Sequence, residues 1–258
     1  MNQKEREVYL IDRLLSERHQ KIDRNTYSFD LYRALVNVRE PWPMDDEYLK
    51  IEDEYLQQVL KEKGIVSIED EKRIVLWQGD ITRLKVDAII NAANEQMLGC
   101  FVPGHQCIDN AIHTFAGIRL RLKCNELMTK QGYLEPTGQV KVTPAYNLPS
   151  RYVFHTVGPI VSSALTERHE KLLKMCYQNC LKKADEMKLE SIAFCCISTG
   201  VFRFPHKKAA KIAMDTVEQY LPASHLKQVI FNVFKDEDKE IYEKLLKEGE
   251  DELATISK

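Results

Sequence analysis

From about Arg73 onward, short apolar runs alternate with longer amphipathic stretches, and this alternation restricts the fold more than any other feature. The runs AIINAA (88–93) and SIAFCCI (191–197) are apolar at almost every position, whereas a strand with one solvated face alternates apolar and polar residues. Strands of this kind are buried on both faces, between layers of helices. The pattern predicts an α/β fold, a three-layer α/β/α sandwich, over residues 73–258, with helices expected over 108–125, 166–187, 205–221 and from 236 onward.

The first 72 residues differ in pattern from the rest of the chain. Their apolar positions recur at helical spacing, as at Leu10 and Leu14, and no strand is expected there. Pro41 and Pro43 interrupt the stretch, and Gly64 is a plausible helix stop. We expect a helical N-terminal extension over 1–72, either a packed cap or a surface on which a partner docks.

Charge and cysteine content limit the partners and the compartment. The 37 Lys and Arg residues nearly balance 39 Asp and Glu residues, so the net charge of −2 gives no general attraction to nucleic acid or to a membrane surface. No apolar run approaches the roughly 18 residues of a membrane span, and the charged N-terminus is unlike a signal peptide. The seven cysteines, an odd number, are expected to be thiols or metal ligands. A cytoplasmic protein that binds neither nucleic acid nor membrane is expected.

Three loops follow predicted strands, at the edge of the sheet where α/β proteins bind ligands. They are residues 78–82, 91–109 and 198–202. The third loop, STGVF, has small residues that could wrap a diphosphate with backbone amides at a helix N-terminus. A plain turn between a strand and a helix fits this loop equally well, because short glycine motifs are weak signals.

The second loop contains Cys100, His105 and Cys107 within eight residues, GCFVPGHQC. Thiolates and imidazole are ligands that suit zinc. Three protein ligands leave a coordination position open, as in sites that engage water or substrate. Because the spacing lacks the usual CxxC pair, a loop with two unrelated buried thiols remains the alternative.

Other chemistry-bearing residues are expected to be structural. His113 and His155 lie in apolar surroundings and are interpreted as hydrogen-bonded core histidines. Four further thiols are interpreted as core residues: Cys176, Cys180, Cys195 and Cys196. Three basic residues are interpreted as the solvated face of one helix: Arg119, Arg121 and Lys123.

With these loops in view, the chain resembles a macrodomain, the fold that recognises ADP-ribose. The resemblance rests on separate motifs that include QGDIT, VDAIINAAN, DNAIHTFAG, CISTGVFRFP and VFKDEDKEIY. It is closest to the branch that removes mono-ADP-ribose from proteins, and within it to the zinc-containing bacterial macrodomains. It implies a mixed sheet, one Zn²⁺ per chain held by the Cys, His, Cys loop, and a helical N-terminal region.

The resemblance also implies roles for individual residues. Asp80 would accept the adenine amino group beside the backbone of Ile81, while Asn94 would face the distal ribose and Asp109 would be the catalytic-loop acid. The remaining ADP-ribose contacts would come from Ser198, Thr199, Gly200 and Val201 around the phosphates and from Phe202 at the distal ribose. The insertion 99–108 and Arg203, which replaces a common glycine, depart from relatives without zinc.

The implied function is hydrolysis of mono-ADP-ribose from a modified protein, with Asn94 and Asp109 as catalytic residues and ADP-ribose and that protein as partners. Zinc would position the distal ribose or activate water, and two thiolates neutralise its charge, which favours the first role. A non-catalytic reader of ADP-ribosylated proteins and a deacylase of O-acyl-ADP-ribose are the alternatives. A zinc nucleobase deaminase fits poorly, because HxE with a following PCxxC is missing.

Overall fold

The computed structural model describes residues 1–256, and the side chains of residues 1–249. Its centre is a six-stranded sheet with the order β1-β6-β5-β2-β4-β3. All neighbouring strands are parallel except β3 and β4, so the sheet is mixed as expected. The strands are β1 (Ile74–Gln78), β2 (Ala88–Ala93), β3 (Val140–Pro144), β4 (Tyr152–Val157), β5 (Ser191–Phe194) and β6 (Gln228–Val233).

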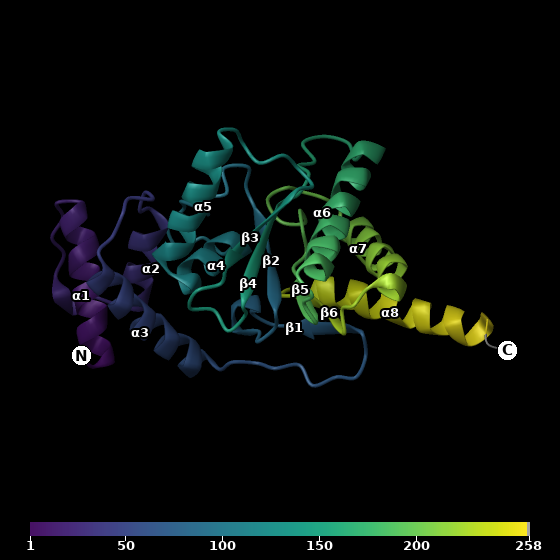
Figure 1. Cartoon of the computed structure of the whole chain (residues 1–258), viewed down its shortest axis with the longest axis horizontal. Helices are drawn as coiled ribbons and strands as arrows, with labels where there is room; N and C mark the ends of the chain where they lie inside the picture. Colours follow the sequence, from purple (N-terminus) through teal and green to yellow (C-terminus); the bar gives the residue numbers. More distant parts are fainter. Residues whose placement is uncertain (257–258) are drawn as a thin grey trace.

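Helices cover both faces of the sheet, which confirms the three-layer sandwich (Figure 1). One layer contains α4 (Ile108–Ala116) and α5 (Ile118–Gln131). The other contains α6 (Glu167–Glu186), α7 (His206–Tyr220) and α8 (Asp236–Ile256). The described residues also form three short 3-10 helices: η1 (Arg24–Thr26), η2 (Ile81–Arg83) and η3 (Leu221–Ala223).

The central strands are buried on both faces, as their apolar runs predict. In β2 every residue but Ala92 is buried, and in β5 every residue but Ser191 is buried. Burying such side chains is the main favourable contribution to folding, roughly 1.5–3 kcal/mol for each large one. These strands fix the positions at which the ligand-binding loops begin.

The N-terminal region is helical, with α1 (Gln3–Glu17), α2 (Phe29–Asn37) and α3 (Asp46–Lys63). The three helices bury their own apolar cluster, which includes Leu10, Tyr32 and Leu56 and reaches Ile118 of α5. Gly64 ends α3 with φ +87°, a conformation that favours glycine. In Figure 1 these helices lie beside α4 and α5, on the outside of that layer.

Two expectations for the stretch after β2 are wrong. The helix expected over 108–125 is two helices, α4 and α5, because Gly117 between them adopts φ +88°. Arg121 is not on a solvated face: it is 5% exposed, and it donates hydrogen bonds to the carbonyl oxygens of Leu98 (2.6 Å), Val36 (2.7 Å) and Arg39 (2.6 Å). Only its flanking basic residues reach solvent in part.

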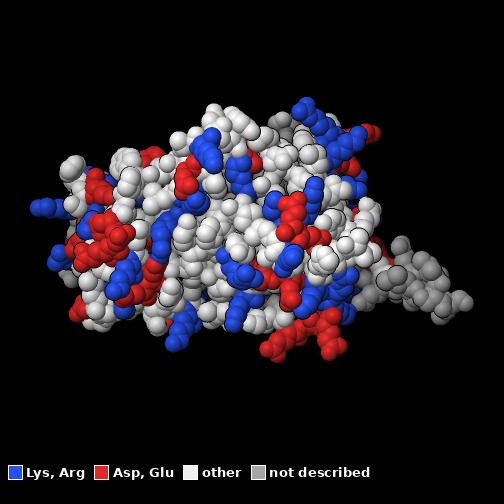
Figure 2. All heavy atoms as spheres, viewed as in Figure 1, with Lys and Arg blue, Asp and Glu red and all other residues white. Residues whose placement is uncertain are grey.

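Surface charge on the face seen in Figure 2 is mixed, with basic and acidic side chains interspersed. This agrees with the balanced composition of the chain. Within the described residues, no helix combines the length and the apolar character needed to cross a membrane.

Candidate functional site

A single cleft of about 750 Å³ brings together the loops that follow the strands. Its volume is in the range of sites that bind drug-sized ligands. Every residue that sequence reasoning assigned to ligand, catalysis or metal lines it: Asp80, Ile81, Asn94, Cys100, His105, Cys107, Asp109, Ser198, Thr199, Gly200, Val201 and Phe202. The three loops therefore form one site, although up to 122 residues of sequence separate them, from Asp80 to Phe202.

One end of the cleft, beside the edge strand β1, is formed by Asp80, which follows Gly79 after that strand. Its Oδ1 atom accepts hydrogen bonds from the backbone N–H (2.9 Å) and the hydroxyl (2.6 Å) of Thr82, and its Oδ2 atom forms an ion pair with Lys63 of α3. Burial alone would raise the pKa of Asp80, but the hydrogen bonds from Lys63 and Thr82 outweigh it, so the pKa lies below its ordinary value. Asp80 is thus an ionised acceptor at the cleft wall.

Residues 198–202, between β5 and α7, form the middle of the cleft, because β5 lies between β1 and β2 in the sheet. Ser198 and Arg203 adopt φ +66° and φ +57°, which is uncommon for residues other than glycine. Gly158, after β4, makes room for this bend, because a Cβ atom there would lie 2.0 Å from the Ser198 hydroxyl oxygen. The loop is therefore held bent by its surroundings, next to the N-terminus of α7.

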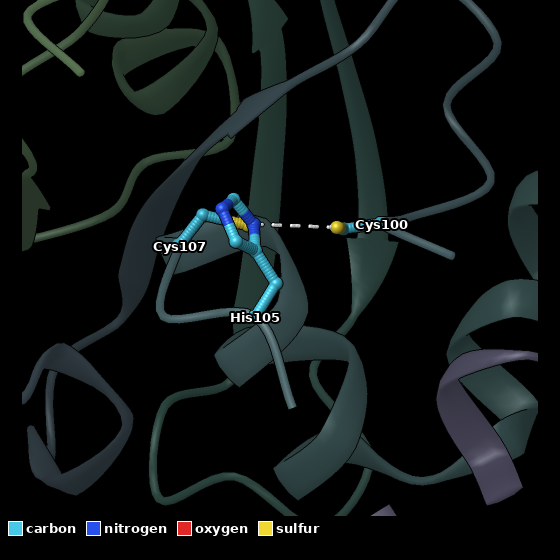
Figure 3. A group of neighbouring side chains, drawn as sticks. All are labelled: Cys100, His105 and Cys107. Carbon is cyan, nitrogen blue, oxygen red and sulfur yellow. Dashed lines mark hydrogen bonds between the residues drawn. The ribbon is translucent and has the colours of Figure 1, made fainter. Parts of the chain in front are cut away.

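The other end of the cleft is formed by the loop 99–107, because it follows β2, which lies beyond β5 as seen from β1. Figure 3 shows the sulfur atoms of Cys100 and Cys107 pointing toward the imidazole ring of His105. The ligand atoms of all three lie within 4.8 Å of one another, and Cys100 Sγ is 3.5 Å from His105 Nδ1. Tetrahedral zinc holds a sulfur at about 2.3 Å and a nitrogen at about 2.0–2.1 Å, which places the two about 3.5 Å apart. The residues therefore fit a zinc ion, and zinc remains a prediction.

Without a cation, the surroundings of Cys107 favour the neutral thiol over the thiolate. Cys107 is the N-cap of α4, and its sulfur accepts a hydrogen bond from the backbone N–H of Asn110 (3.4 Å). Burial, together with the neighbouring Cys100, raises the pKa of the Cys107 thiol to about 12. A bound cation deprotonates a coordinating thiol, and the positive end of a helix stabilises the resulting anion.

Asp109 and Asn94 lie next to the loop 99–107 and line the same cleft. Asn91 of β2 donates a hydrogen bond to Asp109 Oδ1 (2.8 Å), and Asn94 donates to the Gly99 carbonyl oxygen (3.0 Å) and to Asp109 Oδ2 (3.5 Å). Burial raises the pKa of Asp109 to about 6, although the hydrogen bond from Asn91 and the charge of Arg121 act against it. Two amides from β2 and the loop after it thus fix the carboxylate of α4.

A second group of ligand-type side chains, His113, Cys124 and His155, is buried beneath this site. Asn91 Nδ2, which also donates to Asp109, lies 3.1 Å from His155 Nδ1, so that ring nitrogen accepts the hydrogen bond. The ring proton is therefore on His155 Nε2, which lies 2.9 Å from the Thr143 hydroxyl. Burial lowers the pKa of His155 to about 3, so the ring is neutral. Both nitrogens of His155 are thus engaged, as expected of a core histidine.

The other structural expectations for histidines and cysteines are confirmed with two exceptions. His113 is buried as expected, but neither of its ring nitrogens forms a hydrogen bond within the part of the chain that the structure describes, so the expectation of a hydrogen-bonded histidine is wrong there. All seven cysteines are free thiols. Cys176, Cys180 and Cys195 are buried, whereas Cys196 is half-buried and lines the cleft beside Cys195. Both follow β5 at the ligand-binding edge of the sheet, so the expectation of a core residue is wrong for Cys196.

Sequence reasoning did not select several other residues of the cleft, among them Arg33, Lys63 and Phe234. Phe234 directly follows β6 and is 73% exposed, so its position at the end of a predicted strand could have indicated it from the sequence. Arg33 of α2 and Lys63 of α3 belong to the N-terminal helices. No local pattern in the sequence indicates that these helices reach the site.

Comparison with known proteins agrees with this geometry. Residues 90–213 match the Macro domain family. A protein of Treponema medium, named protein-ADP-ribose hydrolase, is 49% identical over 260 residues that cover 95% of this chain and 100% of its own length. The chain belongs to the macrodomain family.

Solved macrodomain structures share the fold. The Oceanobacillus iheyensis macrodomain with ADP has a TM-score of 0.64 and 35% identity, covering 71% of this chain and 96% of that one. The Trypanosoma brucei macrodomain in complex with ADP-ribose has a TM-score of 0.63 and 29% identity, covering 83% of this chain and 94% of that one. The macrodomain resemblance seen in the sequence is therefore confirmed.

Proposed function

We propose that this macrodomain is a hydrolase that removes mono-ADP-ribose from modified proteins. The names of its relatives and the ADP-ribose and ADP bound in related structures support this function. So does the cleft, because it provides groups for each part of the nucleotide in a consistent order. The strands that precede these groups stand in the order β1-β6-β5-β2, so the ionised Asp80 lies at one end, the loop 198–202 in the middle, and Asn94 and Asp109 at the other end.

The adenine would bind at the Asp80 end. A carboxylate that is kept ionised accepts a hydrogen bond from an exocyclic amino group well. The exposed ring of Phe234 offers a flat apolar face for stacking against the base. The diphosphate would follow along residues 198–202, whose bent backbone lies next to the N-terminus of α7.

The distal ribose would lie between Phe202 and the loop 99–107. Hydrolysis breaks the bond between its anomeric carbon and the protein side chain, through a state with oxocarbenium character, and the attacking water loses a proton. Asp109 provides a negative charge close to that carbon, and Asn94 and Asn91 fix the carboxylate. We assign Asp109 and Asn94 as the catalytic residues.

The metal belongs to the same proposal. Cys100, His105 and Cys107 would hold one Zn²⁺ per chain, and three protein ligands leave a position open toward the cleft. When bound, the ion supplies a Lewis-acid position for an oxygen of the distal ribose or for water. Two thiolate ligands reduce its charge, which favours orientation of the sugar over acidification of water.

One observation carries the proposal: three possible zinc ligands and Asp109 line the same end of a cleft large enough for a nucleotide. A reader of ADP-ribosylated proteins needs the adenine and phosphate contacts but neither of these features. The deacylase alternative would use the same residues, so only a comparison of substrates separates it.

The test is release of ADP-ribose from a mono-ADP-ribosylated protein, measured by chromatography before and after treatment with a chelator, with zinc measured by elemental analysis. We expect turnover that falls on chelation and returns when zinc is added. Binding of ADP-ribose without turnover would indicate a reader. Faster turnover of O-acetyl-ADP-ribose than of the modified protein would indicate a deacylase.

A further inference from the structure

The loop that carries the possible zinc ligands is fixed from outside the macrodomain fold. Asn37, the last residue of α2, is 1% exposed, and its Oδ1 atom accepts hydrogen bonds from the backbone N–H of Gly104 (3.0 Å) and from Asn110 Nδ2 (2.9 Å). Its Nδ2 atom donates to the Thr114 hydroxyl (3.0 Å). One buried amide of the N-terminal region thus contacts the tip of the loop and α4 together.

Arg33, one turn earlier on α2, makes a second set of contacts. Its Nε and Nη2 atoms donate to Asn110 Oδ1 (3.0 and 2.8 Å), and Nη2 also donates to the carbonyl oxygen of His105 (3.0 Å). The planar guanidinium of Arg33 therefore contacts two residues at once. One is His105, a possible zinc ligand, and the other is Asn110, whose backbone N–H donates to the possible ligand Cys107.

Asn110 connects these contacts to Cys107, another possible zinc ligand. Its side chain is held by Arg33 and Asn37, it donates to the carbonyl oxygen of Val102 (3.0 Å), and its backbone N–H donates to Cys107 Sγ. Asn110 is fully buried, and its side-chain oxygen and nitrogen both form hydrogen bonds. A displacement of α2 would thus move the His105 backbone, the loop tip and the Cys107 cap together.

The start of the loop is tied to the same helix. Arg121 of α5 donates to the carbonyl oxygen of Leu98, just before the loop, and to those of Val36 and Arg39 at the end of α2. Its guanidinium also lies 4.3 Å from the centre of the Phe101 ring. The loop is therefore anchored on both sides of Cys100 and on both sides of Gly104.

We propose that α2 braces the loop, with Arg33 and Asn37 as positioning residues that hold Cys100, His105 and Cys107 in the arrangement suited to a metal ion. The N-terminal helices are then part of the active site and not a detachable cap. This inference rests on the proposed function only for the identity of the metal. Residues that orient metal ligands typically change metal affinity about 10–100-fold when replaced.

The test uses the full chain with Arg33→Lys and Asn37→Leu, which remove the forked donor and the buried amide. Two matched controls make the same changes elsewhere. Arg6→Lys alters an arginine that donates from Nε and Nη2 to Glu54, and Asn179→Leu alters an amide that donates to the Gly138 carbonyl oxygen. Zinc affinity is measured by competition with a chromophoric chelator, and ligand geometry by the visible spectrum of the cobalt-substituted protein.

We expect Arg33→Lys and Asn37→Leu to weaken zinc binding about 10–100-fold relative to both controls and to alter the cobalt spectrum. Hydrogen exchange at the Gly104 amide, measured by NMR without metal, should become roughly tenfold faster in Asn37→Leu, because that amide loses its acceptor. The conservative Arg33→Lys leaves the half-buried position filled, so its result does not depend on how well Asn37→Leu folds.

Zinc affinity and cobalt spectra equal to those of the controls would overturn the proposal. A wild-type protein that retains no zinc would contradict the metal in the proposed function, and the exchange rate at Gly104 would then decide the bracing by itself. Unchanged exchange in Asn37→Leu would refute it, and faster exchange would support it.

Discussion

Lys63, in the last turn of α3, forms an ion pair with Asp80, the first residue after the loop glycine that follows β1. The Lys63 ammonium also lies 3.6 Å from the centre of the Phe115 ring on α4. The N-terminal helices thus contact the cleft at the Asp80 end through Lys63 and at the loop 99–107 through Arg33. Both ends of the cleft depend on a region that the sequence presents as a separate extension.

This ion pair predicts a pH-dependent change in stability. Because the pKa of Asp80 is lowered in the folded protein, the carboxylate contributes stability above its unfolded pKa of about 3.9, and the contribution is lost as the pH falls through the lowered value. Lys63→Met should therefore reduce the free energy of unfolding by about 1 kcal/mol near neutral pH, and by less in acid. Urea unfolding at several pH values measures the difference. Lys61→Met, an exposed lysine of the same turn, is the control and should show no such trend.

We expect removal of the Phe234 ring to weaken nucleotide binding without lowering the stability of the protein. This exposed ring lines the cleft and is available for stacking against a base. Stacking of a base on an aromatic ring contributes about 1–3 kcal/mol, so Phe234→Ala should weaken ADP-ribose binding roughly 5–100-fold. Calorimetric titration measures this, and Phe234→Trp should retain affinity. Equal affinity in Phe234→Ala and the wild type would place the adenine elsewhere.

We expect a substitution of Cys107 to reduce turnover much more than it reduces ADP-ribose binding. Cys107→Ala removes one possible zinc ligand at the far end of the cleft from Asp80, so turnover should fall much more than ADP-ribose affinity, and zinc content should fall with it. Cys180→Ala, at a fully buried thiol outside the cleft, should keep both zinc and turnover. Equal losses of binding and turnover in Cys107→Ala would count against a catalytic metal.

The position of Gly158 predicts that Gly158→Ala lowers both stability and ADP-ribose affinity, and that a second substitution restores part of both. In Gly158→Ala the new Cβ would lie 2.0 Å from the Ser198 hydroxyl oxygen, so the loop 198–202 must shift, with a cost of about 1–3 kcal/mol in stability and weaker ADP-ribose binding. Adding Ser198→Gly removes the nearest clash and suits the φ of +66°, whereas Ile197 Cγ2, 2.8 Å from the new Cβ, must still shift. Thermal unfolding and calorimetry should show partial recovery in the double variant, and a double variant as impaired as Gly158→Ala would contradict this account.

The sequence predicted the layers and the loops of the site because both depend on local patterns. Buried strands such as β2 and β5 are recognisable as continuous apolar runs, and the residues that follow strands meet at one edge of a parallel sheet. The three possible zinc ligands were recognisable for the same reason, since all of them lie within one loop.

The parts that sequence reasoning missed depend on contacts between distant residues. Arg121 looks like one of several basic residues on a helix face, and only the packing of α2 against the α4 and α5 layer places backbone carbonyl oxygens around it. Arg33 contacts Asn110 across 77 residues, and nothing in either local sequence indicates the pairing. The break at Gly117 was missed because apolar spacing continues through it.

The bend at residues 198–202 has a consequence for how quickly and selectively a nucleotide can be captured. Hydrogen bonds from Phe204 N–H to the Ser198 carbonyl oxygen (3.0 Å) and from Val161 N–H to the Phe202 carbonyl oxygen (2.9 Å) hold the loop in shape within the protein itself. The entropy of ordering this segment is lost during folding, so it is not lost again at each encounter with a ligand. A molecule whose diphosphate does not match this preset curve would be rejected by shape, because the loop has little freedom to adapt to it.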